Sequence, residues 1–140
     1  MVIKIIYGTI SGHSRKVAKA IAEALGTTCE DFTDNPVLTG ADLLFVIGGV
    51  YASKYNEKLL KFMEEADMNQ VKKVALIRSA VSQSALLQEN PLREILKHKQ
   101  IPVEKEEFTF RGNFLFFGCG HPNQAEIAGA VAFAKKVAQA

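Results

Sequence analysis

The chain has 140 residues, a length that fits a single domain able to bury a sizeable core without disulfide or metal support. Hydrophobic residues make up 48% and charged residues 23%, which argues against a disordered, collagen-like or membrane-barrel chain. Its 17 basic and 15 acidic side chains leave a net charge of +2, which offers no strong electrostatic footprint for nucleic acid or an anionic membrane.

The first half of the chain alternates expected strands with an amphipathic helix. Residues 2–7 are apolar apart from one lysine, a pattern typical of a buried parallel strand. After a polar loop comes a helix with an apolar face, and Gly26 stands where a helix-ending glycine belongs. Residues 27–32 predict a shorter strand, and residues 42–47 predict a strongly apolar one that ends at a glycine pair.

The second half continues this alternation. Asparagine favours the N-cap position just before a helix, and proline is tolerated in the first turn. The expected elements, in order, are a loop at 50–55, a helix after Asn56, a strand at 71–77, a stretch without clear pattern at 80–89, a helix after Asn90, a strand at 101–110 and a helix from Asn123 to about Ala138.

Strands that alternate with helices predict an α/β fold, with a mainly parallel sheet covered by helices on both faces. Five strands in 140 residues suit one three-layer, doubly wound domain spanning residues 1–140. Ligands bind such sheets beyond the carboxyl ends of the strands, at the topological switch point. This rule directs attention to the loops at 8–14, 48–55 and 79–89.

The first of these loops has the composition of a phosphate site. The hydroxyls of Thr9, Ser11 and Ser14 are expected to converge there with free backbone N–H groups at a helix N-terminus. The loop lacks G-x-x-x-x-G-K-[ST] and G-x-G-x-x-G, which argues against a nucleotide triphosphatase and the usual dinucleotide fingerprint. The alternative is that Ser11 or Ser14 only caps the helix.

The pattern Thr9-x-Ser11-Gly12-x-Ser14, after an Ile-Ile-Tyr strand, resembles the phosphate-binding loop of the flavodoxin family. Residues 46–51, followed by Lys-Tyr and a Leu-Leu-x-Phe helix, resemble the strand, loop and helix that pass the flavin ring in that superfamily. The chain is most similar to small flavodoxin-domain proteins related to flavodoxin-like protoporphyrinogen oxidases. The resemblance covers nearly the whole chain and implies five parallel strands in the order 2-1-3-4-5.

The resemblance also implies flavin mononucleotide (FMN) as the cofactor, and it implies which residues bind it. The phosphate would be held by the side chains of Thr9, Ser11 and Ser14 and the backbone of Ile10, Gly12 and His13. The residues beside the ribityl chain and the ring would be Gly49, Val50, Tyr51 and Ala52. The pyrimidine side of the ring would be approached by Ser79, Ala80, Val81 and Ser82.

Single side chains at this site have simpler alternatives. Tyr51 could stack on the flavin ring or be a partly exposed loop tyrosine. The imidazole of His13 is expected to point to solvent, and Cys119 with His121 to belong to an ordinary loop. The phenylalanines near the C-terminus are expected to pack in the core, with a flavin wall or a homodimer contact as alternatives; they are Phe108, Phe110, Phe114, Phe116 and Phe117.

The resemblance implies electron transfer or flavin-dependent redox chemistry, in which the protein binds and tunes the cofactor and needs no catalytic side chain and no metal. The partner would be a redox protein or a small-molecule acceptor such as a quinone. The net charge of +2 and a third loop without an acidic-aromatic pattern depart from acidic electron carriers. A flavodoxin-fold interaction or regulatory module without flavin is the alternative function.

The two cysteines have no metal-ligand spacing and are expected to be free thiols in a reducing compartment. No signal peptide is evident, and no apolar run reaches the roughly 18 residues of a membrane span. These features predict a cytoplasmic protein without a membrane span.

Overall fold

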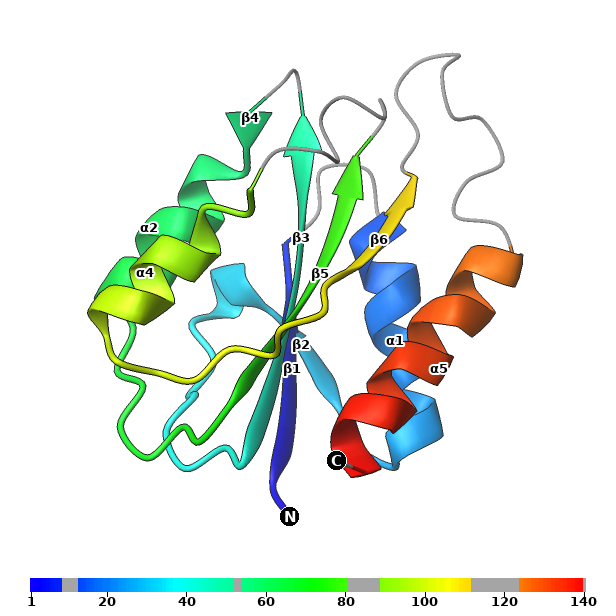
Figure 1. The fold of residues 1–140 in the computed structure, drawn as a ribbon, viewed down its shortest axis with the longest axis horizontal. Coiled ribbons are helices and arrows are strands. Elements are labelled where there is room, and N and C mark those ends of the chain that lie inside the picture. Colours follow the sequence, from blue (N-terminus) through cyan, green and yellow to red (C-terminus); the bar gives the residue numbers. More distant parts are fainter. Residues whose placement is uncertain (9–12, 52–53, 81–88, 112–123, 140) are drawn as a thin grey trace.

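A computed structural model describes residues 1–8, 13–51, 54–80, 89–111 and 124–139. Figure 1 shows a sheet with helices on both of its faces. One face is covered by α1 (His13–Leu25) and α5 (Gln124–Gln139), and the other by α2 (Glu57–Glu65) and α4 (Leu92–His98). The predicted three-layer α/β architecture is therefore confirmed.

Five strands run parallel to one another, in the spatial order β2-β1-β3-β5-β6. Among the parallel strands this is the predicted order 2-1-3-4-5, which is confirmed. Tyr7 lies opposite Ile47, Ile47 opposite Ile77, and Ile77 opposite Phe108, so four strands are aligned across the sheet. The strands are β1 (Ile3–Tyr7), β2 (Cys29–Asp31), β3 (Leu43–Tyr51), β5 (Val74–Ala80) and β6 (Phe108–Arg111).

The expected loop at 50–55 is wrong in part, because β3 continues through Tyr51 and folds back into β4 (Lys54–Tyr55). The two strands pair antiparallel, with Val50 opposite Tyr55. β-branched and aromatic residues fit a pleated strand well, and here they extend the strand beyond the glycine pair. The backbone N–H of Asn56 donates to the carbonyl of Gly49 at 3.1 Å, which closes this hairpin.

The expected helix ends are confirmed. Gly26 has a φ of +68°, and the N–H of Thr27 donates to the Ala22 carbonyl at 2.9 Å, as in a Schellman motif. Asn56 Oδ1 accepts from the backbone N–H groups of the first turn of α2 at 3.1 and 3.2 Å. Asn90 Oδ1 accepts in the same way from the N–H of Leu92 at 3.0 Å.

The last parallel strand is shorter than residues 101–110, because β6 begins at Phe108. Val103 forms one isolated bridge with Val74, and no strand covers the residues that follow it, up to Glu107. Those residues include Glu104, which pairs with Lys73, and Glu107, which pairs with Arg78. Their carboxylates are held by ion pairs here, and the regular ladder resumes only after the last of them.

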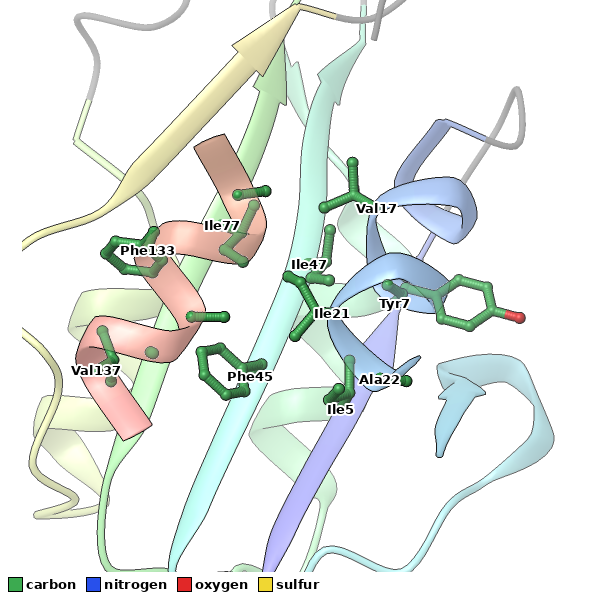
Figure 2. Packing of buried hydrophobic residues seen from close by; sticks show 14 of the residues in the cluster. Ile5, Tyr7, Val17, Ile21, Ala22, Phe45, Ile47, Ile77, Phe133 and Val137 are labelled. Atoms are coloured by element: carbon green, nitrogen blue, oxygen red, sulfur yellow. The ribbon is translucent and has the colours of Figure 1, made fainter. Parts of the chain in front are cut away.

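Each face of the sheet has its own apolar core. Ile5, Phe45 and Ile77 point toward α1 and α5, where they meet Val17, Ile21 and Phe133 (Figure 2). The alternate positions point the other way because neighbouring side chains in a strand face opposite sides. The second core contains Ile6, Leu38, Leu44, Val46, Leu59, Met63, Leu76, Leu92 and Leu96, among others.

Candidate functional site

The carboxyl ends of β1, β3 and β5 lie at one edge of the sheet (Figure 1). The chain passes from β1 outward to β2, then returns to β3 on the other side of β1. The connections therefore change direction between β1 and β3, which is the switch point where open α/β sheets bind ligands. We call Gly8, Gly48, Gly49 and Ser79 the site edge, since Gly8 follows β1 and the other three lie in the carboxyl-terminal halves of β3 and β5.

The first turn of α1 brings polar and basic residues to the end of β1. Ser14 is 3% exposed and His13 is 9% exposed, so the expectation that the imidazole points to solvent is wrong. Burial lowers the pKa of the His13 imidazole, and the charge of Lys16 lowers that pKa further. Acidic side chains normally favour a helix N-terminus, yet this turn has none and carries Arg15 and Lys16 instead.

The glycines of the site edge are closely covered. The N–H of Gly8 donates to the Ile47 carbonyl at 2.9 Å, and a Cβ at Gly8 would lie 2.8 Å from the Phe32 ring. A Cβ at Gly49 would overlap the Ser79 hydroxyl. Side chains larger than hydrogen are therefore excluded here, and the edge consists largely of backbone.

The predicted cofactor-binding residues divide into two groups. Of the described ones, His13 and Ser14 begin α1, while the ring-side residues of β3 and β5 are register neighbours, Gly49 opposite Ser79 and Val50 opposite Ala80. Tyr51 ends β3 opposite Lys54. The structure thus brings the two ring-side sets together on adjacent strands. The predicted residues outside the described ranges are Thr9, Ile10, Ser11, Gly12, Ala52, Val81 and Ser82.

Directly behind the site edge lies a group of polar residues that we call the polar cluster: Tyr55, Arg78 and Asn90, which are buried, and Arg93 and Glu107, which are partly buried. Arg78 Nε lies 3.0 Å from Glu107 Oε2, and their side chains are only 5% and 10% exposed. Arg93 Nε approaches the other carboxylate oxygen of Glu107 at 3.8 Å. The Arg78 Nε–H is misaligned for a hydrogen bond, so the short contact is an ion pair.

The neutral members of the cluster are buried with their polar atoms. Burial raises the pKa of the Tyr55 hydroxyl far above its usual range, and the Glu107 carboxylate raises that pKa further. Asn90 faces the same hydroxyl, but among the described residues neither Tyr55 Oη nor Asn90 Nδ2 completes an aligned hydrogen bond. A Cβ at Gly48 would overlap the Tyr55 hydroxyl, so the cluster touches the site edge.

Sequence reasoning missed this cluster. Arg78 is noticeable in the sequence only as a charge placed near the loops, together with Lys54 and Lys58. Its signal is the period-two pattern of β5: Val74 and Leu76 face α2 and α4, so Arg78 must face that side too. A cation at a buried position of a strand needs an anionic partner close by. The sequence alone does not identify Glu107 as that partner.

Two of the five phenylalanines near the C-terminus lie in the described ranges. Phe110 is buried, and Phe108 packs on Phe133 with ring centroids 6.0 Å apart, whereas the other three phenylalanines, Cys119 and His121 lie outside the described ranges. Within the described ranges, no group of His, Cys, Asp or Glu side chains is arranged to hold a metal ion. A search of the same ranges finds no helix with the length and hydropathy to cross a membrane.

Comparison with known proteins settles the family. The family model described as a flavodoxin domain matches residues 4–115. This chain belongs to the flavodoxin domain family. The resemblance drawn from the first loop and from residues 46–51 is therefore confirmed at the level of the family. No curated protein matches the chain in sequence.

Solved structures show how widely the flavodoxin fold is shared. Flavodoxin 1 from Bacillus cereus aligns with a TM-score of 0.76 and 16% identity, covering 99% of this chain and 98% of that one. A flavodoxin from the domain Archaea gives 0.73 and 16%, covering 99% and 97%. Rubredoxin oxygen:oxidoreductase from Desulfovibrio gigas gives 0.63 and 13%, covering 98% of this chain and 35% of that one. At such identities the likeness establishes the fold alone.

Proposed function

We propose that this flavodoxin-domain protein binds FMN at the site edge and serves in electron transfer or flavin-dependent redox chemistry. The observation that carries the proposal is the first turn of α1, where Ser14 is buried, no side chain is acidic, and Arg15 and Lys16 add positive charge. Such a turn repels no anion, and its N–H groups and dipole favour a phosphate.

The residues present suit FMN in two further ways. Thr9, Ser11 and Ser14 supply hydroxyl donors in sequence positions that match the family's phosphate loop, with the backbone of Ile10, Gly12 and His13. Gly49 offers backbone without a side chain, and the Ser79 hydroxyl fills the space beside it. On this proposal a flat ring would lie against this edge, with Val50, Tyr51 and Ala52 assigned to its β3 side and Ala80, Val81 and Ser82 to its β5 side.

Bound FMN would supply one- or two-electron transfer, while this chain holds, orients and tunes it. We therefore assign no catalytic side chain. The partner would be a redox protein or a small-molecule acceptor such as a quinone, and a homodimer and a cytoplasmic location belong to the same proposal. The net charge of +2 favours a partner that does not depend on an acidic carrier surface. The proposal also takes residues 1–140 to form one domain.

The test compares FMN with riboflavin, which lacks the phosphate. Purified protein is titrated with each, and binding is followed by flavin fluorescence and absorbance. We expect Ser14→Ala to weaken FMN binding by about 1.5–3 kcal/mol, roughly 10- to 100-fold, because a hydrogen bond to a charged group is lost. Riboflavin binding should change little.

The matched control is Thr28→Ala, which removes an exposed hydroxyl next to the amino end of β2. We expect this variant to bind both flavins as the parent does. Equal losses of FMN and riboflavin in Ser14→Ala would contradict the phosphate assignment. A parent chain that takes up neither flavin would reject the cofactor and support the interaction or regulatory module.

A further inference from the structure

The polar cluster is a costly arrangement for a structural role alone. Removing charged groups from water costs several kcal/mol per ion, and an apolar pair of similar volume often stabilises a core as well or better. The face that holds Arg78 and Glu107 is otherwise lined by Val46, Leu59 and Leu76, all fully buried. Packing alone therefore does not explain why charged side chains lie at the end of this apolar face.

The polar cluster lies next to the site edge. Arg78 lies opposite Gly48 in the register, one residue before the Gly49–Ser79 pair of the site edge. Tyr55, on the β4 side of the hairpin, covers Gly48 from the same direction. A strand rises only about 3.3 Å per residue, so the buried charges lie immediately behind the backbone proposed to face the flavin ring.

The charges of the cluster do not cancel. Two guanidinium groups, those of Arg78 and Arg93, meet the single carboxylate of Glu107, which leaves one net positive charge. The nearby Glu89 is exposed, so water screens its charge. The sequence adds no Asp or Glu in residues 9–12, 52–53, 81–88 and 112–123, which follow β1, β3, β5 and β6.

Resting on the proposed function, we propose that the Arg78–Glu107–Arg93 group tunes the bound flavin. Its net positive charge, shared between the buried Arg78 and the partly buried Arg93, favours the reduced cofactor and raises its midpoint potential. Two electrons and one proton convert oxidised flavin into an anionic reduced form, so a fixed cation stabilises the product over the reactant. Buried charges act at longer range than exposed ones because little water screens them.

The direction in which the midpoint potential changes distinguishes electrostatic tuning from a purely structural role of the polar cluster. Arg78→Gln removes a positive charge and should lower the midpoint potential of FMN-loaded protein. Glu107→Gln removes the negative charge and should raise it, and the double variant restores the parent's net charge and should return close to the parent potential. Each single change should alter the ratio of affinities for reduced and oxidised FMN by up to about tenfold, about 30 mV for two electrons.

Potentials are measured by reduction with dithionite in the presence of indicator dyes, and the Kd of oxidised FMN is measured for each variant. Lys97→Gln is the matched control, since it removes an exposed cation from the last turn of α4. It should leave the potential unchanged. If Arg78→Gln does not fold, Arg93→Gln, whose side chain is 26% exposed, carries the same prediction.

Opposite shifts for the arginine and glutamate variants support the inference. Shifts of the same sign, or none, overturn it, because a loosened site would move both variants in one direction. In that case FMN would still bind the parent, and the proposed function would stand. Absence of FMN binding by the parent would instead reject the proposed function, and the tuning inference would fall with it.

Discussion

The two faces of the sheet differ at their carboxyl ends. Toward α1 and α5, the core stays apolar from Phe45 to Ile47 along β3 (Figure 2), and Phe110 continues it opposite Ser79 of the site edge. Toward α2 and α4, the apolar core stops after Leu76, and Arg78 begins the polar cluster. The same backbone therefore carries packing alone on one face and buried charge on the other.

This difference shows that one face of the sheet contributes mainly apolar packing, whereas the other also carries buried charge. An apolar face gains free energy from every methylene it buries. Buried charge does not, because its desolvation offsets most of the attraction between partners. We expect substitutions on the α1/α5 face to act through packing, and substitutions in the polar cluster to act through unpaired charge.

The largest effect should come from Phe45→Ala. Phe45 is fully buried in the α1/α5 core, so truncation removes apolar contacts and leaves a cavity. We expect the free energy of unfolding in urea to fall by about 3–5 kcal/mol. Val37→Ala is the control, because Val37 is 69% exposed and should change stability by less than about 0.5 kcal/mol. Similar losses at both positions would mean that burial does not control stability on this face.

A comparable loss should follow Arg78→Met, for a different reason. The variant leaves the Glu107 carboxylate buried with only Arg93 beside it, and breaking a buried pair costs about 3–5 kcal/mol. Arg78→Met combined with Glu107→Leu removes both charges and should regain most of that stability. Urea unfolding of the single and double variants measures the coupling. Additive losses would show that the two charges do not act as a pair.

Gly48→Ala should have a smaller effect. The new methyl group would overlap the Tyr55 hydroxyl and press on Leu59, an overpacking that costs about 1–3 kcal/mol. Tyr55→Phe removes the overlapping oxygen and should recover part of the loss. A double-mutant cycle by thermal or urea unfolding gives the coupling directly. Zero coupling would place the added methyl away from Tyr55.

The smallest effect concerns pH at the first turn of α1. The pKa of His13 is lowered in the folded state, so the unfolded chain binds a proton more readily. Stability should be unaffected above the unfolded pKa of about 6.5 and should fall as pH drops from there to the lowered folded value. We expect this change to be smaller than the loss caused by Gly48→Ala. Urea unfolding between pH 5 and 8 should show a flatter profile for His13→Gln; parallel profiles would contradict the assignment.

Much of the fold could be predicted because local signals agreed with one another. Residues 2–7 and 42–47 are nearly all apolar, and a strand buried on both faces needs such a run. Gly26 and Asn56 act at the helix ends where their backbone and side-chain chemistry placed them. The order of the parallel strands followed from the family resemblance carried by the first loop and residues 46–51.

Of the features that could not be predicted, one is local and the others depend on contacts between distant segments. The hairpin of β3 and β4 forms after a glycine pair that reads as the end of a strand. β6 begins only after Glu107, whose carboxylate pairs with Arg78, 29 positions earlier in the sequence. The buried position of His13 depends on how α1 packs. The narrower likeness to protoporphyrinogen oxidase relatives stays a prediction, as do the residues proposed to touch FMN.

The central strand has a consequence for how the molecule opens. β3 is bonded to β1 on one side and β5 on the other, and its far end also carries β4. Amide protons in the middle of such a strand exchange with solvent only when the whole sheet separates. Since the hairpin is a continuation of that strand, its backbone is tethered to the slowest-exchanging part of the protein. The rate of amide hydrogen exchange should therefore increase from Ile47 toward Tyr51. The end of the hairpin can then open locally while the rest of the sheet stays closed.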